Sequence, residues 1–527
     1  MDSSQTTSPM PETTAGTSHF PYAAYRPGQR EALEAARGAY ARGKRFVVIE
    51  APTGAGKSGI AVTLAREARQ AYILTAQKIL QDQYIRDFPD LATVKGRSNY
   101  PCLVMDTHAG AAPCLAGKKF PACDDCTYLI AKDDALHAGI ATLNYPYFMG
   151  EINHAGAFQK RDLLVLDEAH NTEEMLMRFV EVLVSKNTLA RAGIDIEFPQ
   201  ISDLEDKISF VSSLIPDTVR ALTRLEEQIK TLEAPPPDIS VQKNELENLL
   251  RRMVMLRDSP DAGWVFEESS EVSFDGQVQW WKFRPITVSA FAEEFIFRHS
   301  SRVLMLSATI LDAETFLRAL GIDPSLAAFI RVPSSFPPQN RPIYPLNIAR
   351  LNRDTLDAEL PKLSAVIAKL LEKHSTEKGI IHAHSYKILR YLVASLPSSK
   401  RLIYHYDSAS REDALERHLT SNQPTVLLTP SMTEGIDLAD DQARWQVIVK
   451  VPYPYLGDPQ VNARRLADPA WYEWRTALRI VQAYGRAVRS SEDHATTYVL
   501  DSMFPLWVQR QQKRLPKWFL EAIAQSK

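Results

Sequence analysis

Short runs of consecutive apolar residues, rich in Val, Ile and Leu, recur along the chain with longer mixed stretches between them. Continuous apolar runs of this length are typical of strands covered by helices on both faces, as in parallel α/β sheets. A proline- and serine-rich stretch at 333–342 separates them into two groups, which predicts two α/β domains. The predicted strands lie at 45–50, 71–75, 163–167, 303–307, 379–384, 425–429, 445–452 and 497–501.

A different periodicity interrupts the first group of strands. Apolar residues recur at steps of three and four positions in two stretches, which predicts two amphipathic helices. The prolines at 235–237 lie between the stretches and predict a turn, so we expect an antiparallel helical hairpin. The periodic positions are Leu222, Leu225, Ile229 and Leu232, followed by Leu246, Leu249, Met253 and Leu256.

Composition narrows the class of protein. Of the 527 residues, 45% are hydrophobic and 24% charged, and the longest apolar runs are too short to span a bilayer, so we expect a soluble globular protein. The net charge of −3 excludes a globally basic surface, so any nucleic-acid-binding surface has to be local. Residues 1–19 lack the apolar core of a secretory signal and predict a disordered tail, which favours a cytoplasmic protein.

A glycine-rich loop follows the first predicted strand. Residues 51–58 have the sequence APTGAGKS and precede an apolar helical stretch, which is the strand–loop–helix context of a phosphate-binding loop. Backbone N–H groups of such a loop surround the β-phosphate, its lysine neutralises phosphate oxygens, and its hydroxyl residue ligates Mg²⁺. The residues expected to contact nucleotide and Mg²⁺ are therefore Gly54, Ala55, Gly56, Lys57 and Ser58.

An acidic box, DEAH, follows the third predicted strand at 167–170. The strand delivers Asp167 to the sheet edge that carries the glycine-rich loop, where a carboxylate can hold Mg²⁺. Glu168 is then placed to polarise the attacking water, and His170 to relay between this site and the second half of the chain. Together the loop and the box predict an enzyme that hydrolyses a nucleoside triphosphate.

Two arginines in the second half complete the expected catalytic set. Residues 482–489 have the sequence QAYGRAVR, which puts Arg486 and Arg489 three positions apart on one helical face. Two guanidinium groups on one face suit a γ-phosphate whose negative charge grows in the transition state.

All four cysteines lie between the glycine-rich loop and the acidic box: Cys102, Cys114, Cys123 and Cys126. Clustered thiols in an otherwise cysteine-free chain predict one metal centre. Four thiolates suit either a tetrahedral zinc ion or a cubane iron–sulfur cluster. Only the last two cysteines form a close pair, and the spacing alone leaves both metals open.

These boxes, in this order, resemble the motifs of superfamily-two helicases, specifically the iron–sulfur branch typified by XPD and DinG. The resemblance spans nearly all of residues 20–505. Besides the loop and the acidic box, the matching segments are YRPGQR at 25–30, LTAQKILQDQ at 74–83, SAT at 307–309, SSFPPQNR at 334–341, HAHSY at 382–386, TEGID at 433–437 and QAYGRAVR at 482–489.

The resemblance implies roles for further residues. Gln29 would contact adenine, segment 74–83 would contact the DNA backbone, and segment 307–309 would couple hydrolysis to strand movement. It also favours the iron–sulfur cluster over zinc. It adds Gly435 and Asp437 to the expected nucleotide-binding residues and Gln482 to the expected catalytic residues, beside Glu168, Asp167, Arg486 and Arg489.

The implied fold has two RecA-like motor domains with parallel sheets. The first is interrupted by a small iron–sulfur domain and by a helical Arch domain. The expected bounds are 1–19 for the tail, 20–96, 141–177 and 286–330 for motor domain 1, 97–140 for the iron–sulfur domain, 178–285 for the Arch and 331–527 for motor domain 2.

The implied activity is ATP-dependent unwinding of DNA by 5′→3′ movement along one strand. The expected cofactors are ATP, Mg²⁺ and a 4Fe–4S cluster, with zinc as the alternative metal. The expected partners are single-stranded DNA and forked or tailed duplex DNA, with no membrane, and the protein is expected to act as a monomer. Two other functions stay open: a nucleic-acid-stimulated ATPase that remodels complexes without unwinding, and an RNA helicase.

Aromatic residues gather near Arg464 and Arg465 in the second half of the chain. They suit either packing in a core or stacking against the bases of a single strand. These residues are Tyr453, Tyr455, Trp471, Tyr472 and Trp474.

Overall fold

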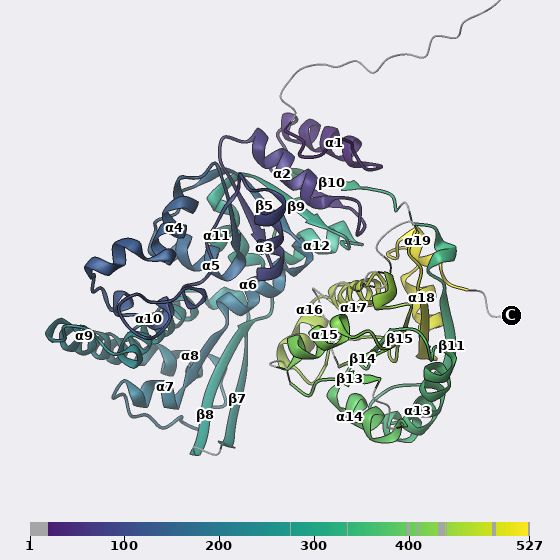
Figure 1. Cartoon of the computed structure of the whole chain (residues 1–527). Coiled ribbons are helices and arrows are strands. Elements are labelled where there is room, and N and C mark those ends of the chain that lie inside the picture. Colours follow the sequence, from purple (N-terminus) through teal and green to yellow (C-terminus); the bar gives the residue numbers. More distant parts are fainter. Residues whose placement is uncertain are drawn as a thin grey trace, which may run out of the picture.

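The computed structural model describes residues 19–273, 276–334, 336–397, 401–407, 410–430, 438, 440–486, 488 and 492–524. It shows two α/β domains, each built on a parallel sheet, with the N-terminal domain at upper left and the C-terminal domain at lower right in Figure 1. All eight predicted strands are present and fall into two sheets as expected. The proline- and serine-rich stretch at 333–342 lies between the two sheets, since β10 of the first ends at Arg331 and β11 of the second begins at Ile343.

The first sheet has the strand order β10-β1-β9-β5-β2-β4-β3 among the described residues. Its central strands are buried along nearly their whole length, because helices cover both faces. The strands are β1 (Phe46–Glu50), β2 (Ala71–Thr75), β3 (Ala92–Thr93), β4 (Ile140–Asn144), β5 (Arg161–Asp167), β9 (Ser300–Ser307) and β10 (Ala327–Arg331). The helices of this domain are α1 (Gln29–Ala41), α2 (Lys57–Glu67), α3 (Lys78–Asp87), α4 (Thr127–His137), α5 (Tyr145–Gly150), α6 (Thr172–Val180), α11 (Ser289–Phe295) and α12 (Ala313–Ala319).

The second sheet has the strand order β11-β16-β15-β12-β14-β13, again with parallel pairing. Its strands are β11 (Ile343–Ala349), β12 (Gly379–His382), β13 (Leu402–Tyr404), β14 (Val426–Thr429), β15 (Trp445–Ile448) and β16 (Thr496–Asp501). Its helices are α13 (Leu356–Lys373), α14 (Tyr386–Ser395), α15 (Arg411–Thr420), α16 (Pro459–Ala467), α17 (Pro469–Tyr484), α18 (Phe504–Gln511) and α19 (Lys517–Leu520).

The cysteine segment lies between β3 and β4 of the first sheet. It consists of short turns of 3-10 helix at Arg97–Asn99, Ala109–Ala111, Pro113–Ala116 and Pro121–Asp125, followed by α4. Ala116 packs against the helical hairpin that follows later in the chain, and Lys118 Nζ donates to Lys230 O at 3.3 Å. The two interruptions of the first domain therefore contact each other.

The second interruption contains the predicted helical hairpin, α9 (Ile215–Thr231) and α10 (Pro237–Asp258), which pack together through Leu222, Leu225, Ile229 and Leu246. Beside the hairpin, this region holds a three-stranded antiparallel sheet in the order β6-β8-β7, which the expected helical Arch domain did not include. Trp281 of β8 is buried against Phe198, so the sheet has an apolar face of its own. The remaining elements are β6 (Val182–Ser185), α7 (Lys186–Arg191), α8 (Leu204–Ser213), β7 (Trp264–Ser273) and β8 (Gly276–Pro285).

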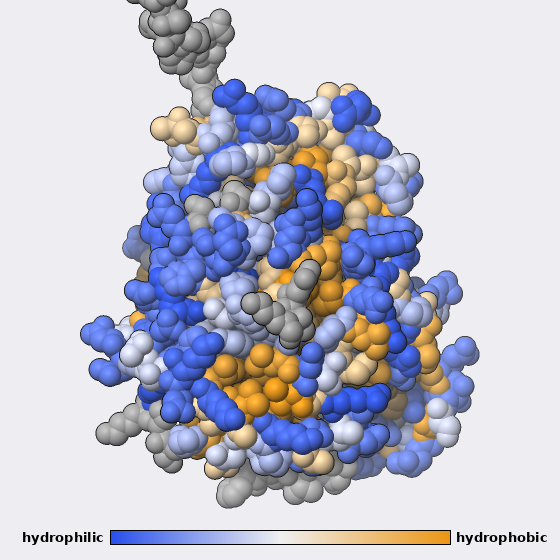
Figure 2. All heavy atoms as spheres, turned by 90° about the vertical axis from the view of Figure 1, so that its right-hand side faces the viewer, coloured by the Kyte–Doolittle hydropathy of each residue, from blue (hydrophilic) through white to orange (hydrophobic). Residues whose placement is uncertain are grey.

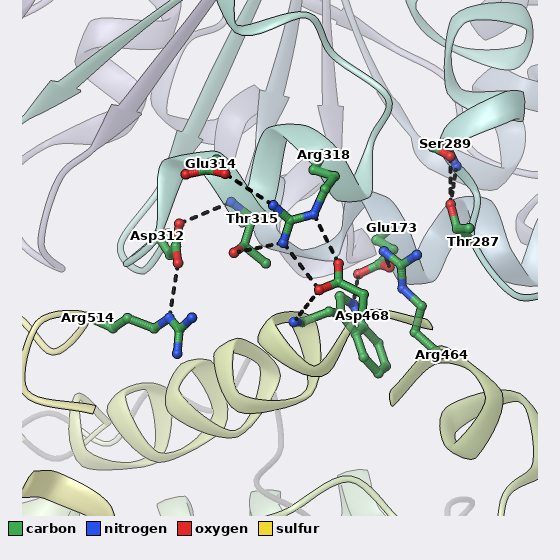
Figure 3. A network of polar contacts seen from close by, with 11 residues as sticks. Glu173, Thr287, Ser289, Asp312, Glu314, Thr315, Arg318, Arg464, Asp468 and Arg514 are labelled. Atoms are coloured by element: carbon green, nitrogen blue, oxygen red, sulfur yellow. Dashed lines mark hydrogen bonds and ion pairs between the residues drawn. The ribbon is translucent and has the colours of Figure 1, made fainter. Parts of the chain in front are cut away.

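The two domains meet where α16 and α17 pack against the first domain (Figure 3). Arg318 of α12 pairs with Asp468, which caps the start of α17, at 3.1 Å. Further contacts join Arg514 Nε to Asp312 Oδ2 (3.0 Å), Trp471 Nε1 to Glu173 Oε2 (2.9 Å), Arg464 Nη2 to Glu173 Oε1 (3.7 Å) and Trp474 Nε1 to Ile310 O (2.7 Å).

The face of the second domain that carries β11 and α18 is mostly polar, with an apolar area in its lower half (Figure 2). Among the described residues, none of the helices combines the length and apolar content that a bilayer crossing needs.

Candidate active site

A cavity of about 360 Å³ lies between the two domains, at the carboxyl ends of β1, β5 and β9. These strands are neighbours in the order β1-β9-β5, so the loops that follow them meet at one edge of the sheet. The cavity brings together motifs far apart in sequence. Its lining includes Gly54, Gly56, Lys57, Ser58, Asp167, Glu168, His170, Ala308 and Thr309 from the first domain and Arg341, Gln482, Gly485, Arg486 and Trp518 from the second.

The glycine-rich loop turns sharply before α2. Gly54 and Gly56 have φ angles of +81° and +78°, a left-handed conformation that glycine adopts without strain. A Cβ atom on Gly56 would lie 2.1 Å from Gln29 Nε2, so this position also has no space for a side chain. The loop thereby directs the N-terminus of α2, with Lys57 and Ser58, into the cavity, where backbone N–H groups and the helix dipole favour an anion.

The buried side chain of Gln29 hydrogen-bonds to the glycine-rich loop and holds it in place. Its side chain is 1% exposed, its Oε1 accepts from the Arg26 backbone N–H at 2.5 Å, and its Nε2 donates to Gly56 O at 2.9 Å. Arg26 Nη1 in turn donates to Gly54 O at 2.6 Å and lines the cavity. The expected contact between Gln29 and adenine stays a prediction. Arg26, which the motif pattern did not single out, is the side chain of this segment that faces the cavity.

The acidic pair lies opposite the loop. Glu168 Oε1 is 3.3 Å from Lys57 Nζ, and Glu168 Oε2 is 3.4 Å from His170 Nδ1. Burial raises the pKa of Asp167 to about 6, and the charge of Glu168 adds to this rise. Burial also acts to raise the pKa of Glu168, but the charges of Lys57, His170 and Arg486 outweigh it and lower that pKa to about 2. Glu168 is therefore the stronger acid of the pair and stays ionised at pH values where Asp167 takes up a proton.

Glu168 has a left-handed backbone conformation with φ of +48°, which is costly for a residue with a side chain. The bend follows directly on the end of β5 and is continued by a turn of 3-10 helix at Ala169–Asn171. Strain of this kind persists where surrounding contacts hold it, commonly at functional sites. Here it turns the Glu168 carboxylate toward Lys57.

The second domain reaches the same cavity through the end of α17. Gln482 Nε2 donates to Thr309 Oγ1 at 3.2 Å, and the charge of Arg486 acts on Glu168. His170 Nδ1 lies 2.7 Å from Ser307 Oγ, so the acidic box also contacts the SAT segment. The other expected site residues of the second domain, Gly435, Asp437 and Arg489, lie outside the described residues.

Arg341, the last residue of the matching segment 334–341, also lines the cavity from the second domain, although no site role was expected for it. Its side chain is buried, with the guanidinium 4.8 Å from the centre of the Trp518 ring and Nη2 donating to Phe336 O at 2.9 Å. It lies in the segment that leads into the second sheet, and no local spacing distinguishes it from a surface arginine.

Comparison with known proteins finds similar sequences and similar folds. A family model described as "Helicase C-terminal domain" matches residues 367–522, and a model described as "Type III restriction enzyme, res subunit" matches residues 23–190. The "ATP-dependent DNA helicase YoaA" of Escherichia coli (strain K12) is 20% identical, covering 90% of this chain and 91% of the relative. Its namesake from Haemophilus influenzae is 21% identical with the same coverage of both chains.

Two solved XPD structures share the fold. One, titled "XPD_Helicase", has a TM-score of 0.65 at 17% identity and covers 92% of this chain and 97% of its own. The S. tokodaii Xpd4 structure has a TM-score of 0.61 at 17% identity, with coverage of 95% and 100%. The matching models, relatives and fold together support a superfamily-two helicase of the XPD/DinG type.

The four cysteines of this XPD/DinG-like helicase line one small apolar cavity and form no disulfide. Cys102 Sγ accepts from the Val104 backbone N–H at 3.4 Å, and Cys114 Sγ accepts from Arg97 Nη1 at 3.5 Å. Burial raises the pKa of Cys114, while the Arg97 charge opposes the rise. As placed, the described residues contain no group of three or more Cys, His, Asp or Glu that could hold a metal ion. The donor chemistry nevertheless suits a thiolate-bound metal, because N–H donors face two of the sulfur atoms.

The aromatic residues of the second domain divide into two groups. Trp471, Tyr472 and Trp474 are buried, and Trp474 is fully covered where α17 meets the first domain. Packing is therefore the correct interpretation for these three. Tyr455 is 78% exposed, and Tyr453 stacks on Tyr472 with 5.9 Å between ring centres.

Proposed function

We propose that this XPD/DinG-like helicase hydrolyses ATP in the inter-domain cavity and uses the cycle to move 5′→3′ along single-stranded DNA and to open tailed or forked duplexes. The observation that carries the proposal is the convergence in one cavity of the glycine-rich loop, the acidic pair and Arg486 of the opposite domain. The polarity rests on the resemblance to XPD and DinG. Two curated relatives that cover 90% of this chain carry the description ATP-dependent DNA helicase, which agrees with this activity.

Phosphate binding is assigned to the start of α2. Its N-terminal N–H groups and the Lys57 ammonium neutralise the β- and γ-phosphates. Lys57 pairs with Glu168 at 3.3 Å. An incoming γ-phosphate competes for the same ammonium, so nucleotide binding releases the carboxylate of Glu168. Asp167 and Ser58 would hold Mg²⁺, which screens the phosphate charge when bound.

Glu168 is assigned to the attacking water. Its low pKa keeps it ionised at neutral pH, and His170 at 3.4 Å limits its rotation. An ionised carboxylate can accept a hydrogen bond from water and orient it for in-line attack. Arg486 approaches from the second domain and stabilises the charge that develops on the γ-phosphate.

Coupling to movement is assigned to the contacts that join the domains across the nucleotide. The hydrogen bond from Gln482 to Thr309 and the approach of Arg486 both depend on the separation of the domains. Binding and release of the γ-phosphate therefore close and open the cavity, and a strand held by both domains is advanced with each cycle. Segment 74–83 of the first domain is the proposed strand contact, because it resembles the corresponding motif of the family.

We further propose that Cys102, Cys114, Cys123 and Cys126 hold a 4Fe–4S cluster, with zinc as the alternative, and that 97–140 forms an iron–sulfur domain beside the strand path. Support comes from the four thiols that line one cavity and from the N–H donors on Cys102 and Cys114. N–H donors of this kind are typical around cluster sulfur atoms. A bound cluster would cross-link the short 3-10 turns of this segment and supply folding free energy.

An unwinding assay on 5′-tailed DNA, 3′-tailed DNA and RNA duplexes tests the function. We expect strand separation only with the 5′-tailed DNA, and none with Lys57→Ala. Lys362→Ala, which removes an exposed lysine on α13, is the matched control and should unwind like the wild type. DNA-stimulated hydrolysis without unwinding would favour the remodelling ATPase, and unwinding of the RNA duplex would favour an RNA helicase. Unwinding by the Lys57→Ala variant would contradict the assignment of the cavity.

A further inference from the structure

Tyr84 contacts the acidic pair but has no part in the function proposed above. It lies on α3, is 3% exposed and lines the cavity. Its hydroxyl donates to Asp167 Oδ2 at 3.1 Å, while the Glu168 backbone N–H donates to Asp167 Oδ1 at 3.0 Å. Each carboxylate oxygen of Asp167 is therefore held by one donor, and the two bonds together fix the plane of the carboxylate.

These two bonds leave acceptor capacity on both oxygens. An ionised carboxylate accepts at about four lone-pair positions, so two donors still leave positions for a cation or its bound water. Groups that hydrogen-bond a ligating carboxylate orient it, and their loss typically weakens metal binding by about 10–100-fold. The Tyr84 hydroxyl is such a group, because it hydrogen-bonds to the carboxylate of Asp167.

The position of the hydroxyl is set by a firmly held helix. Gln81, one turn before Tyr84, is fully buried. Its Nε2 donates to Thr93 Oγ1 at 2.6 Å, to Val94 O at 3.0 Å and to Thr142 O at 3.1 Å, which fastens α3 to β3 and β4. The Tyr84 ring packs beside Phe88, with 6.0 Å between ring centres. Helix α3 therefore fixes the hydroxyl relative to the sheet edge that carries Asp167.

We propose that Tyr84 is a positioning residue that orients Asp167 for Mg²⁺ binding, an inference that rests on the ATPase function proposed above. The hydroxyl acts through Asp167 and not on the nucleotide. Its loss therefore changes the Mg²⁺ concentration that the enzyme needs, whereas the rate at saturating Mg²⁺ is retained. Tyr84 is not part of any motif used above, and only its contact with Asp167 reveals it.

Tyr84→Phe tests the proposal, because it keeps the ring and removes the hydroxyl. In a Mg²⁺ titration of the DNA-stimulated ATPase, we expect the half-saturating Mg²⁺ concentration to rise about tenfold or more, with kcat at saturating Mg²⁺ within about twofold of the wild type. Binding of Mn²⁺ in the presence of ADP, followed by electron paramagnetic resonance, should weaken by a similar factor. This second readout does not depend on turnover.

Tyr145→Phe is the matched control. Tyr145 is also fully buried near the acidic box, but its hydroxyl lies 2.9 Å from Thr172 Oγ1 and makes no hydrogen bond to Asp167. This variant should keep the wild-type Mg²⁺ midpoint. If Tyr84→Phe melts below the assay temperature, Tyr84→Met, which fills similar space without a hydroxyl, is measured in its place.

The outcomes separate this inference from the proposed function. A wild type that depends on Mg²⁺ and a folded Tyr84→Phe with the same midpoint would overturn the role of Tyr84 alone. A lower kcat with an unchanged midpoint would overturn it as well, because the hydroxyl would then act on the chemical step. A wild type that hydrolyses no ATP at any Mg²⁺ concentration would overturn the proposed function itself.

Discussion

Replacing Asp167 by Asn should abolish ATP hydrolysis and at the same time stabilise the metal-free protein. The Asp167 side chain is only 6% exposed and lies beside the negatively charged Glu168. Asparagine has almost the same shape and keeps both hydrogen bonds. Its oxygen can accept from the Glu168 backbone N–H, and its NH₂ group can donate to the Tyr84 hydroxyl, which is able to accept. The substitution therefore removes a buried charge and little else.

The magnitude follows from the raised pKa of Asp167. Folding moves this pKa from 3.8 to about 6. Since one pKa unit corresponds to about 1.4 kcal/mol, ionised Asp167 destabilises the metal-free protein by ~3 kcal/mol at neutral pH. The shift in melting temperature per kcal/mol becomes smaller as a domain grows, and this domain extends from α1 to β10, so Asp167→Asn should raise the melting temperature by several degrees.

The direction of the Asp167 pKa shift also determines how the stability of the protein depends on pH. A carboxyl whose pKa is higher in the folded state binds its proton more tightly there, so the wild type gains stability as the pH falls from about 7 to 4. Asp167→Asn lacks this gain. Glu168 acts in the opposite direction and in a lower window, because its pKa is lowered from 4.5 to about 2 and its stabilisation is lost as the pH falls through that range.

Differential scanning calorimetry in EDTA at pH 7.5 and pH 5 measures these differences. The wild type should approach the variant in stability at pH 5 and fall below it at pH 7.5. Adding MgCl₂ and ADP should stabilise the wild type far more than the variant, because Asp167 is the proposed ligand. A variant that melts at or below the wild-type temperature in EDTA at pH 7.5 would refute the reasoning that the Asp167 charge is costly when no Mg²⁺ is bound.

Three further substitutions test other parts of the molecule. Arg486→Ala should lower kcat on the order of a thousandfold while ADP binding, measured with a fluorescent analogue, is retained; loss of binding with normal kcat would contradict the assigned role. Cys126→Ser should release the iron, measured by elemental analysis, and lower unwinding more than DNA-stimulated ATPase; stoichiometric zinc without iron in the wild type would replace the cluster by zinc. Trp474→Phe removes the hydrogen bond between Trp474 and the Ile310 carbonyl, which keeps its second bond from the Asp312 backbone N–H at 2.8 Å, so the expected loss is ~0.5–1.5 kcal/mol and calorimetry should show a lower melting temperature; an unchanged melting curve would contradict the importance of this contact.

The local pattern of apolar and polar residues was sufficient to predict those helices and strands whose buried face is formed by one continuous segment. The strands β1, β2 and β5 each contain an unbroken apolar run, and α9 and α10 carry an uninterrupted step of three and four. The glycine-rich loop and the acidic box were likewise visible, because backbone geometry and metal chemistry restrict which residues can follow a strand there. These features depend on neighbours in sequence, so the sequence alone determined them.

Strands that form only by pairing with a segment far away in the sequence could not be predicted from the local pattern. Strand β4 carries Thr142 and Asn144 within its short run, and β7 is rich in Glu and Ser; each becomes a strand only because another strand pairs with it. Register between segments far apart in the chain has no local signal. The antiparallel sheet of the second interruption was missed for this reason.

The arrangement of the site was decided by tertiary structure in the same sense. Gln29 supports the loop from behind, and Arg341 faces the cavity, because of how α1 and the inter-domain linker pack. Tyr84 and Asp167 are 83 positions apart in the sequence. They come into contact because α3 is held against β3 and β4. Trp474 binds a carbonyl of the first domain. The residue types were present in the sequence, but a hydrogen bond needs its two atoms within about 3 Å, and only the packing of helices on the two sheets sets such distances.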